Sequence, residues 1–254
     1  MIIWKEGNMR IGIKNPQEIK LMRESGRILG IILAELEKMI APGITGLDLD
    51  TKAEKMMKEF NVLPSFKGYH GYKYVTCVNI NEQVVHSIPT SIPLKEGDII
   101  TVDCGVIYQG FHSDSAIQKG VGQIKPEVKK FLDTTEKALR KGIAIAKPGI
   151  RIQVISATIE DVLKKEGYGI VRELIGHGIG TKMHEDPPVP NYRDTTPGPI
   201  LQEGMTIAIE PIVTMGNHRI KTLRDGWTVV TFDNSLATQV EHTIAITKKG
   251  SEIL

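Results

Sequence analysis

The stretch EGDIITVDCGVIYQGFHSDSAI, residues 96–117, decides the fold because it encodes a β-hairpin with acidic residues on one face. Two runs of strand-forming residues flank residues 108–110, where we expect the turn. Side chains alternate between the two faces of a strand, so Asp103 and Asp114 should lie nearly opposite each other on the same face. The ordinary alternative is a pair of surface aspartates on the wet face of a sheet.

Two ionised carboxylates in this position repel each other. At a separation of about 4 Å the repulsion is roughly 4 kcal/mol for an effective dielectric constant of about 20, and like charges opposite each other destabilise a sheet. A divalent cation would offset the repulsion, because hard cations prefer oxygen ligands and one carboxylate can bridge two of them. For an arbitrary pair of aspartates the surface alternative would be favoured, so the hairpin indicates a metal site only when further residues are considered.

Three residues elsewhere in the chain strengthen this prediction. Glu210 ends the apolar run MTIAIEP, Glu241 interrupts the strand-like run QVEHTIAI, and His177 lies between glycines in GHGIG. Alone, each glutamate would more often be an edge-strand charge, and a single histidine is more often a hydrogen-bonded core residue than a ligand. Together with Asp103 and Asp114 they supply four negative charges and one neutral nitrogen, which balances two divalent cations. This mixture suits Mn, Fe, Co or Zn rather than copper(I).

Helical periodicity predicts a pair of helices on each side of the hairpin in the sequence. The first begins near Asn15-Pro16-Gln17-Glu18 and ends before Pro42-Gly43, and the others cover 47–60, 126–146 and 154–165. Asp48 or Asp50 is available near the start of the second helix. Short β-branched runs at 99–102, 207–209, 229–232 and 243–246 predict strands.

The order helices, strands, helices, strands is repeated with matching motifs. Pro42-Gly43-Ile44 matches Pro148-Gly149-Ile150, His70-Gly71 matches His177-Gly178, Glu96-Gly97 matches Glu203-Gly204, and Asp103 matches Glu210, all at a nearly constant offset. We interpret this as one α+β domain, residues 1–254, with pseudo-two-fold halves at about 15–120 and 121–250.

Composition indicates an ordinary globular protein of the cytoplasm. A hydrophobic fraction of 41% with 24% charged residues excludes a disordered chain, and a net charge of +2 without basic blocks argues against direct nucleic-acid binding. The two cysteines, Cys77 and Cys104, lack CxxC spacing, which fits a reducing compartment. The charged N-terminus MIIWKEGNMR is not typical of a secretory signal, and the longest apolar stretch, 28–36, is too short to cross a membrane.

At these residues the sequence resembles the type I methionine aminopeptidases of metallopeptidase family M24, in the short form without an N-terminal extension. The resemblance covers nearly the whole chain. The segments that carry it are GYHGY at 68–72, VNINEQVVHSIP at 78–89, VDCG and FHSD around the two aspartates, GHGIG followed by HEDPPVPNY, AIEP, and EHTIAI. It implies a pita-bread fold, in which a curved antiparallel sheet carries helix pairs on its outer face and a dinuclear metal centre on its inner face.

The resemblance assigns roles to individual residues. The family's metal ligands fall on Asp103, Asp114, His177, Glu210 and Glu241, the same set as above. The implied catalytic residues are His86, His184 and Glu210, and the implied substrate-binding residues are His86, His184, Tyr69, Tyr72, Cys77, Met183 and Trp227. The family often has an aromatic residue in place of Met183 and a smaller one in place of Phe66, so the exact shape of the pocket stays open.

The implied activity is hydrolysis of the N-terminal methionine from nascent proteins, with a preference for a small second residue. Two divalent ions, Co, Mn, Fe or Zn, would activate water, Glu210 would transfer its proton, and His184 and His86 would hydrogen-bond the substrate. The implied partners are nascent polypeptide N-termini, with the ribosome as a further candidate and no membrane, and we expect a monomer.

Two alternatives remain. A proline-specific peptidase of the same fold uses a very similar ligand set, although such relatives usually carry an extra N-terminal domain, and here the first helix begins almost at once. A metal-free relative that only binds peptides would be expected to have lost ligands, whereas all five are present. His70, His112 and His218 receive no firm role, and a structural one is expected for all three; His70 mirrors His177 in the repeat and is therefore a candidate neighbour of the site.

Overall fold

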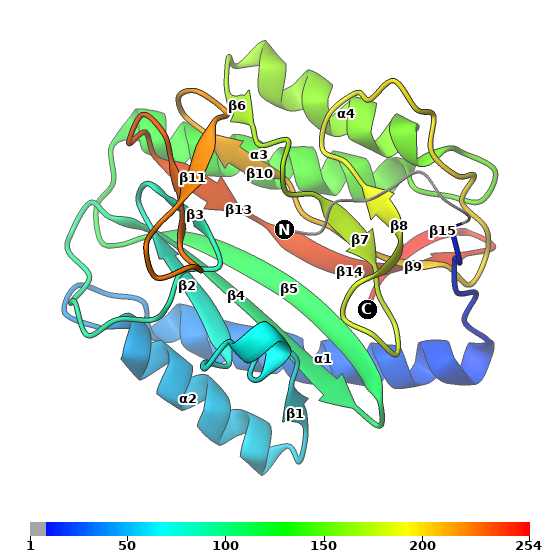
Figure 1. The fold of residues 1–254 in the computed structure, drawn as a ribbon, viewed down its shortest axis with the longest axis horizontal. Helices are drawn as coiled ribbons and strands as arrows, with labels where there is room; N and C mark the ends of the chain where they lie inside the picture. The colour runs from blue at the N-terminus through cyan, green and yellow to red at the C-terminus, as the bar shows by residue number, and fades with distance from the viewer. Residues whose placement is uncertain (1–8) are drawn as a thin grey trace.

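The computed structural model describes residues 9–254 as a curved antiparallel sheet flanked by two pairs of helices (Figure 1). In Figure 1 the first pair lies along the lower side of the molecule and the second pair along the upper side. The helices are α1 (Pro16–Met39), α2 (Gly46–Glu59), α3 (Pro126–Ile145) and α4 (Ile152–Lys165), and a short 3-10 turn covers Tyr69–Gly71. The predicted α+β class and helix pairs are confirmed.

Side-chain caps fix the start of each helix in the first pair. The Asn15 side chain accepts hydrogen bonds from the backbone N–H groups of residues 17 and 18, and Glu18 accepts one from the N–H of Asn15. Thr45 and Asp48 form the same capping box at α2. Of the two aspartates considered for that end, Asp50 is instead buried, where it accepts hydrogen bonds from residues 75 and 76.

The main sheet has nine strands among the described residues. They are β1 (Leu63–Pro64), β2 (Thr76–Ile80), β4 (Ile99–Tyr108), β5 (Phe111–Gly120), β7 (Gly176–Gly178), β8 (Glu185–Val189), β9 (Thr206–Ile209), β14 (Glu241–Thr247) and β15 (Gly250–Ile253). Their order is β1-β4-β5-β14-β9-β7-β8, with β2 beside β4 and β15 beside β14. Strands from the two halves of the chain therefore meet at the β5–β14 pair in the middle of the sheet.

Two three-stranded sheets complete the fold. One contains β6 (Gly169–Ile170), β10 (Ile212–Thr214) and β13 (Ala237–Gln239), and the other contains β3 (Gln83–Val85), β11 (Ile220–Thr222) and β12 (Val229–Thr231). The second of these sheets is important for the site, because its hairpin β11–β12 and the residue after β3 border the main cavity.

The pseudo-two-fold repeat is visible in the backbone hydrogen bonds. Gly43 donates to the carbonyl of Leu94 at 2.8 Å, and its counterpart Gly149 donates to the carbonyl of Leu201 at 2.9 Å. Both glycines have a positive φ, 93° and 89°, in a backbone region that other residues rarely adopt. The matched Pro-Gly-Ile motifs are therefore equivalent turns that lead from the first helix of each pair into the second.

Each helix pair buries its own core against the outer face of the sheet. Leu36 of α1 and Leu49 of α2 are fully buried in a cluster with β2 and β4, and Phe131 and Leu139 of α3 are fully buried in a second cluster with β9 and β14. The inner face of the sheet is consequently left for side chains that need access to substrate.

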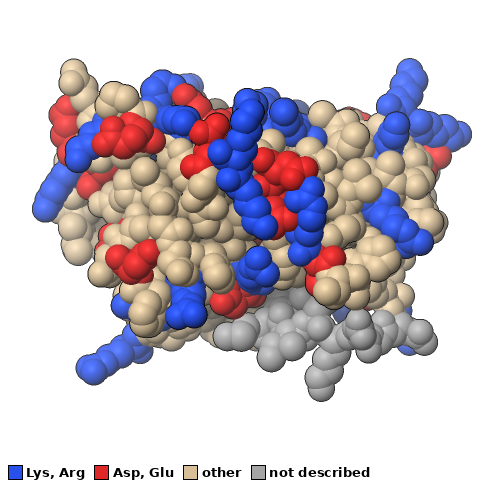
Figure 2. Space-filling model, turned by 90° about the horizontal axis from the view of Figure 1, so that it is seen from above, with Lys and Arg blue, Asp and Glu red and all other residues tan. Residues whose placement is uncertain are grey.

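The helical face of the second pair carries charges of both signs. Figure 2 shows lysines and arginines interspersed with acidic residues when the molecule is seen from the side of α3 and α4. Several of them form ion pairs, such as Lys129–Asp133 and Lys130–Glu166, both at 2.6 Å. Exposed pairs of this kind contribute little to stability, because solvent and salt screen the charges.

Within residues 9–254, none of the helices combines the length and hydropathy needed to cross a membrane. Most of the charged N-terminal segment that is not typical of a secretory signal, residues 1–8, lies outside the described part of the chain.

Candidate metal centre and substrate cavity

The hairpin β4–β5 places its two aspartates as the sequence predicts. The turn lies at Gln109-Gly110, where φ is 47° and 84°. Asp103 pairs with Ala116, and Asp114 pairs with Gly105, so the two aspartates occupy diagonal positions on the same face. Both side chains are buried, at 6% and 5% exposure, which excludes the alternative of a wet surface pair.

One row of side chains crosses the inner face of the sheet. Cys77 pairs with Asp103, Asp103 with Ala116, and Ala116 with Glu241, on strands β2, β4, β5 and β14. Ala116 separates the two carboxylates with only a methyl group. The row therefore joins a buried thiol, a small spacer and acidic residues from both halves of the chain.

His177 enters the site from β7, where the flanking glycines allow close packing of the backbone. A Cβ at Gly176 would collide with the carbonyl oxygen of Ala208, and one at Gly178 would collide with that of Asp186. The imidazole donates from Nδ1 to the carbonyl oxygen of Gly178 at 2.9 Å. This hydrogen bond leaves Nε2 as the nitrogen with a free lone pair, as a metal ligand requires.

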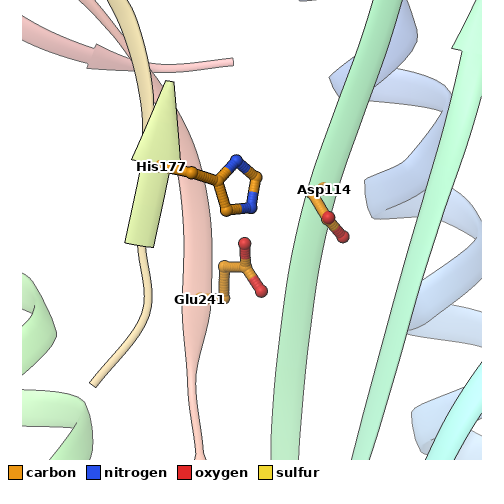
Figure 3. A group of neighbouring side chains, drawn as sticks. All are labelled: Asp114, His177 and Glu241. Carbon is orange, nitrogen blue, oxygen red and sulfur yellow. The ribbon is translucent and has the colours of Figure 1, made fainter. Parts of the chain in front are cut away.

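Ligand atoms from three strands converge in the centre of the site. One atom each from Asp114, His177 and Glu241 lies within 4.8 Å of the others, and Figure 3 shows the side chains of His177 and Glu241 extending toward the strand that carries Asp114. Glu210 borders them, because its Oε1 is 3.7 Å from Nε2 of His177. Asp103 lines the same cavity, diagonal to Asp114 on the neighbouring strand.

Gln239 links two of the acids and was not predicted. Its Nε2 donates to Glu210 at 3.2 Å and to Glu241 at 3.1 Å. The alternation of side chains in TQVEH would have placed residues 239 and 241 on one face, so the signal was present in the sequence.

The acids are in an environment that disfavours their charges. Desolvation by burial raises the pKa of Asp103 to about 7 and the pKa of Glu210 to about 8. Burial and the neighbouring carboxylates raise the pKa values of Asp114 and Glu241 well above the ordinary range. Burial also lowers the pKa of His177 to about 4, so its imidazole is neutral at physiological pH.

Buried oxygens without hydrogen-bond partners test whether metal ions fit this site. Among the described residues, Oδ1 of Asp103, Oδ1 of Asp114 and Oε1 of Glu241 are buried and have no partner. Such orphaned oxygens are unusual in proteins, and positive charge in the centre would satisfy them and lower the pKa values of the acids. The donor set fits divalent cations.

An apolar subsite lies beside the acids. Phe66, Tyr72, Cys77 and Met183 form a buried cluster, with Tyr69, Tyr74, Ile88 and Trp227 packed against it. The hydroxyl of Tyr72 donates to the backbone carbonyls of residues 76 and 87, and its ring packs edge-on against Trp227 with centroids 4.9 Å apart. Polar as well as apolar contacts therefore hold Tyr72 in the wall of the apolar subsite.

The cavity that contains both parts has a volume of about 590 Å³. It is lined by all of the residues predicted as metal ligands, catalytic residues or substrate-binding residues: Tyr69, Tyr72, Cys77, His86, Asp103, Asp114, His177, Met183, His184, Glu210, Trp227 and Glu241. Phe66 and His70 also line it. His112 lies to one side, where its Nδ1 is 2.9 Å from the hydroxyl of Ser65.

Two further histidines border the acids. His86 follows β3 with a φ of 59°, and desolvation lowers its pKa to about 4 although its side chain is accessible. The ring of His184 stands edge-on against that of His177, with centroids 4.3 Å apart, and burial lowers the pKa of His184 to about 2. Its Nδ1 lies 2.8 Å from the hydroxyl of Tyr69, a contact that joins segments far apart in the sequence.

Comparisons with known proteins show the family of the chain. Residues 20–248 match the model of metallopeptidase family M24. The chain is 47% identical to "Methionine aminopeptidase 1" of Bacillus subtilis, over 95% of this chain and 97% of that protein. A crystal structure of methionine aminopeptidase from Thermotoga maritima is 43% identical with a TM-score of 0.94, covering 96% of this chain and 98% of that one.

A more distant structure, the prolidase from Pyrococcus horikoshii OT3, is 26% identical with a TM-score of 0.77. It covers 95% of this chain, but this chain covers only 62% of the prolidase. The relatives matched over nearly their full length are thus methionine aminopeptidases. The chain belongs to metallopeptidase family M24, in its methionine aminopeptidase branch.

Proposed function

We propose that this protein is a metal-dependent aminopeptidase that removes the first methionine from nascent polypeptides. The observation that carries the proposal is that one cavity joins a cluster of buried acids and an imidazole to an apolar subsite. The first part suits hydrolysis and the second suits an unbranched apolar side chain. The names of the relatives point to the same reaction.

Asp103, Asp114, His177, Glu210 and Glu241 would hold two divalent ions, with four carboxylates matching their charge. When bound, such ions lower the pKa of water to produce a nucleophile near neutral pH, and they polarise the carbonyl of the substrate. Oxygen ligands with one imidazole are compatible with Co, Mn, Fe or Zn.

Glu210 is the group that we propose for proton transfer. Glu210 lies in the same cavity as the other acids, with its Oε1 3.7 Å from Nε2 of His177, and bound cations would keep its carboxyl ionised and able to accept a proton from the attacking water. The carboxyl then returns the proton to the amine that leaves. Gln239, donating to Glu210, keeps one of its oxygens oriented during both steps.

His184 and His86 are neutral and border the acids, so they can donate hydrogen bonds without adding charge. We propose that His184 donates to the carbonyl oxygen of the scissile bond, where negative charge develops, and that His86 contacts the amide. The substrate's methionine side chain packs in the cluster formed by Phe66, Tyr72 and Met183, together with Cys77 and Trp227.

Both halves of the chain are needed for this site, since Asp103 and Asp114 come from the first and the other ligands from the second. We therefore propose that residues 1–254 act as one catalytic unit, and as a monomer because a single chain completes the cavity. The substrates are new chains with free N-termini, which makes the cytoplasm the compartment and the ribosome an additional partner in the proposal. The free, buried cysteines are compatible with a reducing compartment.

The substrate is tested with two tripeptides after loading the protein with Mn or Co. Met-Ala-Ser should release free methionine, because the apolar subsite accepts the thioether side chain. Ala-Pro-Gly should stay intact, because the methyl group of its first residue does not fill this subsite. In Glu210→Gln, methionine release should fall at least about 100-fold, since the proton acceptor is lost. Cleavage of only the proline peptide would identify a proline-specific peptidase, and cleavage of neither would favour a peptide-binding module.

The second residue of the substrate should control the rate. In a Met-Xaa-Ser series from Gly and Ala to Leu, kcat/KM should fall as the second side chain grows, because a larger group must displace protein atoms beyond the scissile bond. Amino-acid analysis of released methionine gives the rates. Equal values for Ala and Leu would contradict a restricted space for this residue.

His184→Ala should reduce kcat about 100-fold or more, because a donor to the developing oxyanion is removed. Its metal content should equal that of the wild type, since His184 is not one of the five ligands. Elemental analysis after dialysis and steady-state kinetics measure the two quantities. Loss of both metals in this variant would show that His184 is a ligand instead.

Removal of the metals should make the stability fall as the pH rises from 6.5 to 8. The carboxyls of the site titrate near pH 4 when the chain is unfolded, but their pKa values are raised in the folded, metal-free protein. The folded state then binds more protons, so the stability present at lower pH is lost as the pH rises through these pKa values. Urea midpoints of the chelated protein measure this.

The same titration with Mn in excess is the control. Bound cations favour the ionised carboxyls, so the midpoint should no longer decline between pH 6.5 and 8. A midpoint of the chelated protein that is constant or rises over this window would contradict the burial of protonated acids.

A further inference from the structure

The hydroxyl of Tyr69 makes a specific contact with one of the cavity's histidines. Its Oη lies 2.8 Å from Nδ1 of His184, and the two rings are tilted by 53° with centroids 5.3 Å apart. The two residues are 115 positions apart in the sequence. The distance is that of a well-formed hydrogen bond.

This hydrogen bond selects between two forms of the imidazole. In a neutral histidine one ring nitrogen carries the proton and the other accepts, and the partner of one nitrogen determines the state of the other. Burial raises the pKa of the Tyr69 phenol, so it stays protonated and able to donate. If it donates to Nδ1, the proton of His184 must be on Nε2, which no described residue hydrogen-bonds.

We propose that Tyr69 is a positioning residue that holds His184 in the Nε2–H tautomer, ready to donate to the carbonyl oxygen of the substrate. The donation from His184 to the substrate rests on the proposed function, but the hydrogen bond and the tautomer can be observed without any reaction. It assigns to Tyr69 a role beyond lining the methionine subsite.

The backbone around Tyr69 is built to fix this side chain. Gly68 and Gly71 have φ values of 92° and 89°, and His70 between them has a φ of 47°. The N–H of Tyr69 donates to the carbonyl of Phe66 at 2.9 Å, and the ring of His70 stands edge-on against the Tyr69 ring with centroids 4.4 Å apart. Residues held in the left-handed region persist only where the surrounding structure determines them, often at functional sites. His70 thus lies near the site through its contact with Tyr69.

The segment that carries His184 is fixed as well. The next residue, Glu185, accepts from Nζ of Lys14 at 2.6 Å in a pair that is largely buried. Its other oxygen accepts from the backbone N–H of Lys182 at 3.1 Å. Both partners of the Tyr69–His184 hydrogen bond are therefore anchored by contacts of their own, which keeps the two atoms at bonding distance.

Tyr69→Phe tests the tautomer directly, because it removes only the hydroxyl. In the zinc-loaded protein with ¹⁵N-labelled histidine, NMR should show an unprotonated Nδ1 and a protonated Nε2 for His184. The signal is assigned by its loss in His184→Gln. In Tyr69→Phe both nitrogen shifts should move toward a mixture of the two tautomers. A protonated Nδ1 in the wild type, or unchanged shifts in Tyr69→Phe, would overturn the proposal.

Tyr72→Phe is the matched control for the NMR measurement. It removes a hydroxyl from the same wall, but that hydroxyl donates to backbone carbonyls and not to a histidine. The His184 signals should keep their tautomer pattern in this variant. A change as large as in Tyr69→Phe would show that loss of either hydroxyl merely disturbs the wall.

Kinetics provide a second test. Tyr69→Phe should lower kcat for Met-Ala-Ser about 2- to 10-fold, the effect of one neutral hydrogen bond, with little change in KM. In the His184→Ala background the same substitution should have no further effect, because Tyr69 acts through His184. Equal losses in both backgrounds would overturn the proposal. Because the NMR result needs no hydrolysis, failure of the tripeptide to react would count against the function and not against the tautomer.

Discussion

Four carboxyl groups are buried together on the inner face of one sheet, and the rest of the structure depends on this constraint. Burying ionised carboxylates is costly unless opposite charge is present, and here their pKa values rise because burial and mutual repulsion disfavour the charges. An apolar core would be more stable in the absence of metal ions. In the proposed function these groups bind cations, and the stability of the protein is then linked to that binding.

The pseudo-two-fold fold is a way to bring such groups together. Each half supplies a helix pair that buries the outer face of the sheet. The inner face is therefore not covered by these helices and can carry polar side chains. The halves join where β5 pairs with β14. Ala116 of β5 pairs with Glu241 on one side and with Asp103 on the other, so it lies between the two acids. Acids that are distant in the sequence thus become neighbours in a single row, held by backbone hydrogen bonds rather than by flexible loops.

The sequence predicted those features that depend on the periodicity of a single element, such as the face of a strand on which a side chain lies. The alternation of a strand and the turn at residues 108–110 were sufficient to place Asp103 and Asp114 on one face. The alternation of side chains also places Gln239 on the same face as Glu241. Gln239 was not predicted as a site residue, because an uncharged amide in a strand gives no sign that it needs a charged partner. For the start of α2, both aspartates were plausible, and only the burial of Asp50 against residues 75 and 76 shows which one caps the helix.

Contacts between distant segments could not be predicted in this way. The bond between Tyr69 and His184 depends on the three-dimensional path of a strained turn and of the segment before β8. The resemblance to a family placed both residues in the pocket, but it gave no reason why one should orient the other. Periodicity describes a single element, whereas this contact depends on the relative position of two.

The division of the site between strands and loops has a consequence for its chemistry. The acids and His177 lie in or at the ends of strands of the main sheet, while Tyr69, His86, Met183 and Trp227 lie in turns and connections. Strand positions are fixed by hydrogen bonds on both sides, so the metal chemistry can be kept while the connecting segments vary. In the proposed function, the segments around residues 66–72 and 183–184 line the methionine subsite, and the Tyr69 hydroxyl that contacts His184 connects this subsite to the proposed catalytic donor.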